Sequence, residues 1–431
     1  MIFKFILSSL CVAFSAAFPS TSISFAIDIV NCNIRSIYHP KKEDIVRYTQ
    51  YWSDENMKGS VAWNLNVCTF GNSEYTLSPA SDHPVFPEIV TVPCSGKTPY
   101  SNMDYDVDTS LGLKEYYAFQ EFSAKAYEKY NGKVLTAVRR IVINIPETTY
   151  AYGQGSVGCD GEYCFTWIED RRSFFWLPGG TQTPVMSTLL HELGHTLTLE
   201  HSGSLSLIPG QSPWAYGDSS CIMGSADSTL TCFNAPNARQ LGYITPVADM
   251  DDLDMPLNTW ISKVIPIFST SPQNPITLRS KGLFPTTIFL SARSKDAAAN
   301  GADSGLSPTY DKVLSIHMTK KQSIDDREDS TIIAILKPGS IYLLKPGVSM
   351  VTYYIESIMY PFDKMEASIA IKLISLSNAG GAVVSICRFP NGKQADSSCK
   401  ETFSEAPRHF VHKKKMIAQS GSFGMLHHYS L

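Results

Sequence analysis

Three histidines within eleven residues constrain this fold more tightly than any other feature of the sequence. The segment His191–His201 reads HELGHTLTLEH. Residues four apart lie on the same face of an α-helix, so the imidazoles of His191 and His195 would point toward one place. His201 would point away from that place if the helix continued. It can join the other two histidines only if the helix ends near residue 198 and the chain turns back.

The flanking residues predict the same helix. Thr183 is suited to cap its start and Pro184 to occupy its first helical position, because an N-cap side chain accepts a backbone N–H and proline has none to leave unpaired. Three leucines spaced four apart form an apolar stripe. They are Leu189, Leu193 and Leu197. This helical context and the third histidine disfavour the alternative, a helix with two solvent-facing histidines.

These residue types in this order are typical of a zinc-dependent hydrolase. Neutral imidazoles bind Zn²⁺ at about 2.0–2.1 Å, so His191, His195 and His201 are the predicted metal ligands and Zn²⁺ the predicted cofactor. Glu192 lies beside the first ligand, where its carboxylate can reach a water on the metal without becoming a ligand. The cation lowers the pKa of that water, so Glu192 can act as the general base and later protonate the leaving amine.

A second motif follows the histidines. The segment Tyr216–Gly224 reads YGDSSCIMG and places Met223 in a turn bounded by glycines. With Phe233–Pro236 and Leu241–Tyr243, these motifs resemble the gametolysin (autolysin) family of zinc metallopeptidases, in the metzincin clan. The resemblance implies a metzincin-like α+β protease domain, with Met223 as an apolar floor beneath the metal. It also implies endopeptidase activity on extracellular proteins, with matrix or cell-wall glycoproteins as the substrate class.

One position departs from the metzincin pattern. That pattern has glycine three residues after the second histidine, whereas this chain has Thr198. A turn with positive φ costs a non-glycine residue about 1–2 kcal/mol, and a β-branched residue more than most. We expect Thr198 to adopt the positive φ, because the unchanged spacing from His191 to His201 leaves little slack. The alternative is a turn displaced by a residue or two and relieved at Gly203.

The predicted function is a secreted zinc endopeptidase that cleaves extracellular proteins or peptides. The alternative is a catalytically inactive binding or adhesion protein on a metzincin scaffold, which Glu192 argues against because loss of the base is the usual route to inactivity. We expect substrate to pair with an edge strand near Phe174–Trp176. His317 and Tyr216 are candidates for a second oxyanion donor by residue type, and a buried structural role is favoured for His317.

The chain divides into five predicted segments. Residues 1–26 are expected to be a signal peptide ending at Ser24–Ala26, because an apolar run follows Lys4. Residues 27–100 form an N-terminal segment that could serve as a pro-region, with a predicted strand at Val61–Cys68. The remaining segments are a catalytic domain over 101–260, a C-terminal all-β, sandwich-like domain over 261–400, and a disordered basic tail over 401–431.

Within the catalytic domain, apolar residues at three- and four-residue spacing predict a helix over Leu111–Tyr130. Val138–Ile145, closed by Pro146, is expected to be a buried strand. The glycine-rich run Gly153–Gly161 lacks the Lys-Ser/Thr of a phosphate-binding loop and is predicted to be a turn.

The cysteines indicate an oxidising compartment. Of the ten, Cys11 lies in the leader, so the remaining number is odd. Close spacing predicts three local disulfides, namely Cys159–Cys164, Cys221–Cys232 and Cys387–Cys399. Cys32, Cys68 and Cys94 would then supply one further disulfide and one spare thiol. If that thiol belongs to Cys32 or Cys94, its thiolate could bind the metal and keep a precursor inactive.

Charge and hydropathy limit the partners. The chain has 36 Lys and Arg against 40 Asp and Glu, a net charge of −4, so it lacks the basic field that nucleic-acid binding requires. No apolar stretch beyond the leader is long enough for a transmembrane helix, so no membrane anchor is expected. We therefore expect secretion to the extracellular space. The sequence does not specify an oligomeric state.

Overall fold

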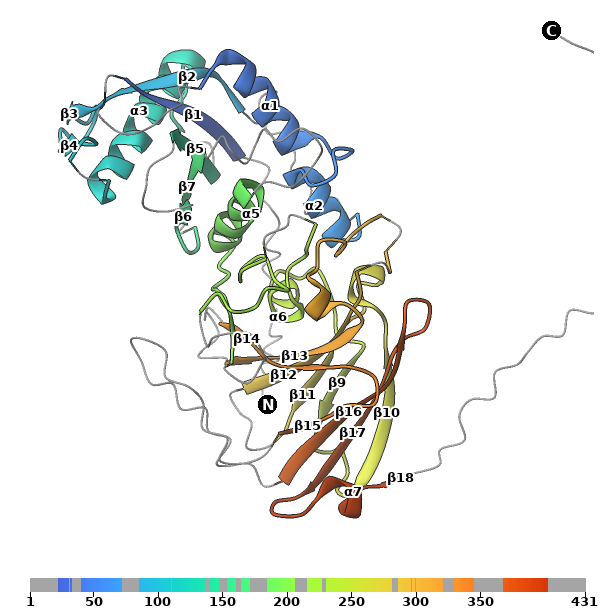
Figure 1. The fold of residues 1–431 in the computed structure, drawn as a ribbon. Coiled ribbons are helices and arrows are strands. Elements are labelled where there is room, and N and C mark those ends of the chain that lie inside the picture. The colour runs from blue at the N-terminus through green and yellow to red at the C-terminus, as the bar shows by residue number, and fades with distance from the viewer. Residues whose placement is uncertain are drawn as a thin grey trace, which may run out of the picture.

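A computed structural model of the chain describes residues 22–30, 32, 40–71, 85–109, 111–135, 140–146, 153–159, 164–170, 184–205, 215–226, 230–280, 286–295, 297–298, 300–320, 329–344 and 367–401. The strands fall into two regions, an N-terminal mixed region and a C-terminal region rich in strands (Figure 1). Helices α5 (Pro184–Thr196) and α6 (Ala235–Gln240) lie between them. The described residues thus form a mixed structure with several sheets and few helices.

The N-terminal region is built on a five-stranded sheet. Its strand order is β2 (Val85–Pro93), β1 (Ser22–Val30), β5 (Arg140–Pro146), β7 (Cys164–Asp170) and β6 (Gly153–Gly155). The first four strands are parallel, whereas β6 runs antiparallel to β7 at the edge. β5 confirms the strand predicted over Val138–Ile145 for its described residues. The short strands β3 (Ser95–Lys97) and β4 (Asp104–Asp106) pair separately beside this sheet.

Helices cover both faces of this sheet. Along β5, Ile141 and Ile143 pack into one core with α3 (Leu113–Asn131). Val142 points to the other face, because side chains alternate along a strand, and packs with the core of α5. The helices α1 (Lys42–Ser53) and α2 (Val61–Cys68) share that second core. The helix predicted over Leu111–Tyr130 is confirmed as α3, which ends at Gly132 with φ of 64°.

The strand predicted at Val61–Cys68 is wrong, because this segment is the helix α2. Ser60 caps it by accepting a 2.9 Å hydrogen bond from the backbone N–H of Trp63. Nearly every side chain of α2 is buried, including the polar Asn64. A helix that is buried all round has no polar face, so a short apolar segment of this kind resembles a strand in sequence.

The segment predicted as a possible pro-region contributes two strands to the sheet. β1 pairs with both β2 and β5, and the Phe25 side chain is fully buried. Loss of residues 27–100 would remove the last four residues of β1 and all of β2 from this sheet. Cleavage at Ser24–Ala26 would likewise cut β1 in the middle of its pairing with β5.

The C-terminal region contains two sheets. One has the order β8 (Ser202–Ser204), β14 (Ser330–Leu336), β13 (Val313–Lys320), β12 (Thr286–Arg293), β11 (Ile276–Arg279) and β9 (Ala248–Asp251). The other has the order β15 (Ile341–Leu344), β16 (Ala367–Ser377), β17 (Gly381–Pro390), β10 (Thr259–Ile265) and β18 (Lys400–Glu401). Side chains of both sheets, such as Ile316 and Ile386, share one apolar core.

Short helices complete this region, and the tail lies outside it. The 3-10 helices η3 (Phe268–Thr270) and η4 (Pro308–Tyr310) and the single-turn α7 (Ala395–Ser398) connect the strands. Residues 402–431, most of the expected basic tail, lie outside the described residues. Among the helices of the described residues, none has the length and apolar character needed to cross a bilayer.

The disulfides correct part of the predicted pairing. Cys159–Cys164 and Cys387–Cys399 are confirmed. The predicted Cys221–Cys232 pair is wrong, because Cys232 bonds Cys68 of α2, 164 positions earlier in the chain. Cys32 bonds Cys94, so neither offers the thiolate expected to block the metal. Among the described residues, the free cysteine is Cys221, which is fully buried.

The long-range disulfide yields a stability prediction. Replacing both Cys68 and Cys232 by alanine should lower the free energy of unfolding by about 2–5 kcal/mol, because the bond closes a long loop and restricts the unfolded chain. Urea unfolding monitored by circular dichroism measures the loss. Cys221→Ala is the control, since it removes a buried sulfur but no crosslink. A loss no larger than that of the control would contradict the pairing.

Candidate active site

Helix α5 carries the first two histidines and ends where the spacing requires. Two hydrogen bonds mark the end of the helix. The N–H of Thr198 donates to the His195 carbonyl at 2.9 Å, and the N–H of Leu199 donates to the Gly194 carbonyl at 3.1 Å. Thr198 has φ of 70°, so the expected left-handed turn is confirmed and the chain reverses before His201. The displaced turn relieved at Gly203 does not occur. Thr198 itself is exposed.

Arg140 supports the end of this helix from the adjacent strand β5. Its Nε donates to Thr196 Oγ1 at 2.8 Å and its Nη2 to the Thr196 carbonyl at 3.2 Å. The last carbonyls of a helix lack intrahelical partners and carry partial negative charge. The buried guanidinium therefore gives the Thr196 carbonyl a hydrogen-bond partner and places a positive charge at the negative end of the helix. Gly158 N–H adds a further bond to the His195 carbonyl at 2.9 Å.

The structure brings the three predicted histidines together. One nitrogen from each of His191, His195 and His201 lies within 4.8 Å of the others. His191 Nδ1 bonds the Ile222 carbonyl and His195 Nδ1 the Leu199 carbonyl, both at 2.8 Å. A carbonyl can only accept, so each Nδ1 carries the proton and each Nε2 keeps a free lone pair. Nε2 of His195 and His201 lie 3.1 Å apart.

The environment keeps these rings neutral. Burial, followed by the neighbouring His195, lowers the pKa of His191 to about 3, and the same two causes lower the pKa of His201 to about 4. Burial also lowers the pKa of His195. Neutral imidazoles at neutral pH are the form that binds a metal. Three neutral rings whose nitrogens converge, two of them oriented by backbone carbonyls behind them, fit a divalent cation such as Zn²⁺.

Glu192 is buried beside the histidines, against the edge strand β6. A side chain at Gly153 would meet Glu192 Cγ at 2.9 Å, and one at Gly155 would meet the Glu192 carbonyl at 2.8 Å. These two glycines therefore let the strand approach the helix. Burial raises the pKa of the Glu192 carboxyl to about 8. The predicted turn at Gly153–Gly161 thus begins with a strand, and its alternating glycines were the sequence signal for close packing.

Met223, predicted to form an apolar floor beneath the metal, packs against the helix that carries His191 and His195. Its side chain is fully buried and lies against the Cα of Gly194 in α5, where a methyl group would collide with the Met223 sulfur. The preceding residue, Ile222, supplies the carbonyl that orients His191. The Met-containing turn therefore supports the helix by packing and one ligand by hydrogen bonding.

A buried carboxylate anchors this turn. Asp218 accepts hydrogen bonds from Ser220 N–H at 2.9 Å, from Ser202 Oγ at 2.8 Å and from Asn234 Nδ2 at 3.1 Å. His317 Nε2 of β13 lies 3.0 Å from the same carboxylate. Burial alone would raise the pKa of Asp218, but His317 and the hydrogen bonds from Ser220 and Asn234 lower it below its usual value. These contacts therefore stabilise the ionised form of the buried Asp218 carboxylate.

Through this network the C-terminal region helps to position the third histidine. Ser202 follows His201 directly and begins β8, where it pairs with Ser330 of β14. Asn234 Nδ2 bonds both serine hydroxyls, at 2.7 and 2.8 Å. The chain after His201 is therefore held by the six-stranded sheet. The structural role favoured for His317 is borne out by its burial and its contact with Asp218, a partner that no local motif indicates.

Tyr216 lies over the histidines. Its ring centroid is 4.0 Å from that of His201 and 5.6 Å from that of His191. Burial, then the charge of Glu192, raises the pKa of its hydroxyl, so the phenol stays protonated. Tyr216 therefore remains a candidate donor at this site. The expected substrate-pairing segment Phe174–Trp176 lies outside the described residues.

Comparisons with known proteins agree with this geometry. Residues 23–334 match the family model described as gametolysin peptidase M11. The chain is also similar to an autolysin of Chlamydomonas reinhardtii, with 25% identity over 194 residues, covering 38% of this chain and 28% of the autolysin. The matched part is thus well under two thirds of that relative's length.

Among solved structures, one similarity is to an archaemetzincin from Methanopyrus kandleri, at 16% identity. It covers 52% of this chain and 96% of the archaemetzincin, with a TM-score of 0.22. A similarity at this TM-score adds nothing to the description of the fold.

The strained turn yields a second prediction. Thr198→Gly should raise the free energy of unfolding by about 1 kcal/mol, because relief of about 1–2 kcal/mol at positive φ exceeds the entropy that glycine adds to the unfolded chain. Thr198→Ala is the matched control, since it loses the hydroxyl and methyl groups but keeps the Cβ that causes the strain. Equal stabilities of the two variants in urea would contradict the assignment.

The buried contact between Asp218 and His317 yields a third prediction. A double-mutant cycle of Asp218→Asn and His317→Gln should show a coupling free energy above about 1 kcal/mol, because removing either partner leaves a buried polar group of the other without its hydrogen-bond partner. Asp249 and Arg279, an exposed pair 3.2 Å apart in the same sheet, provide the control. Its coupling should stay below that value. Additive effects at Asp218 and His317 would mean that their contact contributes nothing specific.

Proposed function

Because the chain belongs to the gametolysin peptidase family, a family of metalloproteases, we propose that it is a secreted zinc endopeptidase that hydrolyses peptide bonds of extracellular proteins. The observation that carries the proposal is the convergence of three neutral histidine nitrogens beside a buried glutamate. His191, His195 and His201 would hold the ion through Nε2. Zn²⁺ bound there would acidify a water molecule and polarise the scissile carbonyl.

Side chains of the protein would carry out the proton transfer and the stabilisation of the oxyanion. Glu192 would take a proton from the attacking water and deliver it to the leaving amine. Packing against Gly153 and Gly155 restricts the motion of this carboxylate, which favours one orientation toward the histidines. Tyr216, protonated and with its ring centroid 4.0 Å from that of His201, is the candidate to donate a hydrogen bond to the oxyanion.

We propose β6 as the strand to which substrate adds. β6 pairs with β7 through one edge, and within the described part of the chain no strand pairs with its other edge. It lies directly against Glu192 of α5. An extended peptide that adds to an exposed edge gains backbone hydrogen bonds in register with the strand. A substrate bound in this way would lie beside the proposed base.

The proposed peptidase unit is larger than the segment 101–260 expected from sequence. The family match begins within β1 and ends within β14, and so includes the six-stranded sheet that holds Ser202. Residues beyond this match, with β15 to β18, would form the rest of a β-rich C-terminal domain. The N-terminal strands then belong to the enzyme itself rather than to a removable pro-region.

Secretion is proposed from the apolar leader and the disulfides, which persist in oxidising compartments. A leader that ends before Ser22 would leave β1 intact. Cell-wall or matrix glycoproteins are the proposed substrate class, supported by the similarity to an autolysin.

A pair of variants tests the function. Glu192→Ala should retain about one zinc per chain while lowering kcat on a protein substrate by about 10² or more, the size expected for loss of a positioned general base. His191→Ala should lose both zinc and activity. Zinc is measured by atomic emission, and hydrolysis is followed with casein in the presence and absence of a chelator. Stoichiometric zinc in His191→Ala, or unchanged turnover in Glu192→Ala, would refute these roles.

A further inference from the structure

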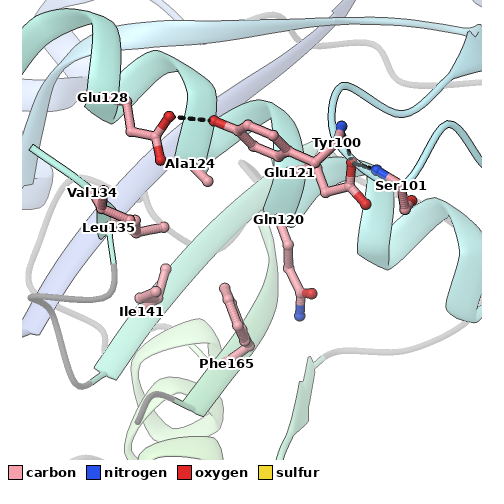
Figure 2. A pocket seen from close by; sticks show the side chains of 10 residues that line it. All are labelled: Tyr100, Ser101, Gln120, Glu121, Ala124, Glu128, Val134, Leu135, Ile141 and Phe165. Carbon is pink, nitrogen blue, oxygen red and sulfur yellow. Dashed lines mark hydrogen bonds between the residues drawn. The ribbon is translucent and has the colours of Figure 1, made fainter.

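A pocket of about 530 Å³ lies on the opposite face of the N-terminal sheet from the histidines. It is bounded by α3, by Leu135 after that helix, and by Ile141 and Phe165 of β5 and β7 (Figure 2). Ile141 packs with the core of α3, whereas Val142 next to it packs with the core of α5. The sheet therefore separates this pocket from the proposed metal site. Its volume is within the range of pockets that bind small ligands or single side chains.

The pocket combines an apolar floor with an acidic rim. Leu135, Ile141 and Phe165 form the floor, and Glu121 and Glu128 of α3 stand at the rim. Of the described residues that line it, none is a lysine or arginine. An anion would be repelled by these two carboxylates, and a wholly apolar ligand would gain nothing from their negative charge. The lining therefore selects for an apolar group that carries a positive charge.

Hydrogen bonds hold the Glu121 carboxylate in place. Its Oε2 accepts from the backbone N–H groups of Tyr100 at 2.7 Å and Ser101 at 3.0 Å. Burial raises the pKa of Glu121, but the hydrogen bonds from Ser101 and Tyr100 outweigh it, so that the pKa is lowered. The group therefore stays ionised with a fixed orientation.

Glu128 is oriented by the side chain that bridges the two carboxylates. The Tyr100 hydroxyl donates to Glu128 Oε2 at 2.6 Å (Figure 2). Burial, then Glu128 itself, raises the pKa of Tyr100 to about 12, so the phenol remains a donor. Tyr100 thus holds one carboxylate through its backbone and the other through its ring. Two negative charges are positioned at one rim before any ligand arrives.

We propose that this pocket binds an arginine or lysine side chain of a protein, with the apolar stem on the floor and the cationic head at Glu121 and Glu128. Such side chains lay their methylene groups along apolar surface while keeping the charge at a polar edge. Charge-assisted hydrogen bonds to a prepositioned carboxylate are stronger than neutral ones. As an exosite for substrate the pocket rests on the proposed peptidase function, whereas the binding itself does not.

Binding is tested by calorimetry on the full chain carrying Glu192→Ala, so that the probe is not cleaved. The probe is the peptide acetyl-Ala-Leu-Arg-Leu-Ala-amide, with citrulline in place of arginine as its neutral isostere. The arginine peptide should bind at least about tenfold more tightly than the citrulline peptide, because only its head is charged. Equal affinities, or no heat from the arginine peptide, would overturn the proposal.

Matched variants place the site. Glu121→Gln with Glu128→Gln keeps both hydrogen-bond acceptors but removes both charges, and should weaken the arginine peptide by about tenfold or more. Ala124→Phe, which fills the pocket from α3, should abolish binding without a change of charge. Glu88→Gln, an exposed position on β2, is the control and should bind as before. Unchanged binding in the first two variants would place the peptide elsewhere.

A last binding measurement, with agmatine as the probe, distinguishes a protein partner from a free amine. Agmatine carries the guanidinium without flanking peptide and should bind more weakly than the arginine peptide. Agmatine binding as tightly as the peptide would identify a small-amine site and overturn the assignment to a protein partner. Because none of these measurements depends on hydrolysis, their failure is separate from failure of the peptidase proposal.

Discussion

The buried carboxylate of Asp218 is the interaction on which the rest of the site depends. It joins three stretches of chain that are far apart in sequence, namely the turn containing Met223, the strand that begins at Ser202, and His317 in the C-terminal sheet. An unpaired charge at this depth would strongly destabilise the protein, so its partners must be in place for the fold to form. The position of His201, next to Ser202, follows from that requirement. The third candidate ligand is thus held by a sheet formed mostly by later residues.

Close approach of backbones is the second constraint on the site. Gly153 and Gly155 let β6 lie against Glu192, and Gly194 lets α5 rest on Met223. In each place a single methyl group would lie 3.0 Å or less from an atom of a neighbouring residue. The helix is therefore held between an edge strand and an apolar floor. Rigid support of this kind keeps catalytic groups close to their productive geometry.

The two faces of the N-terminal sheet have different characters. One face carries α5 and an apolar core around the neutral histidines. The other carries α3 and a pocket whose rim holds two carboxylates. Strand alternation produces this separation, because neighbouring residues such as Ile141 and Val142 point in opposite directions. One sheet thus supports a proposed reaction centre and a proposed recognition site that do not touch.

Local sequence determined those features that depend on neighbouring residues. The four-residue spacing of His191 and His195 made them share a helix face, and the fixed distance to His201 required the turn at Thr198. Periodicity identified α3, and the motif around Met223 identified the floor of the site. Each of these follows from backbone geometry within a few turns of chain.

Tertiary structure decided what depends on distant partners. Val61–Cys68 is a helix buried on nearly all sides, so it has no polar face from which the sequence could reveal a helical period. Cys232 bonded Cys68 rather than the nearby Cys221, because folding brings α2 beside it. Asp218 contacts His317, which lies 99 positions later in the chain, and β1, whose first residues were predicted to lie in a leader, is an inner strand of the sheet. Local patterns carry no information on such contacts, since they arise only when separate elements pack together.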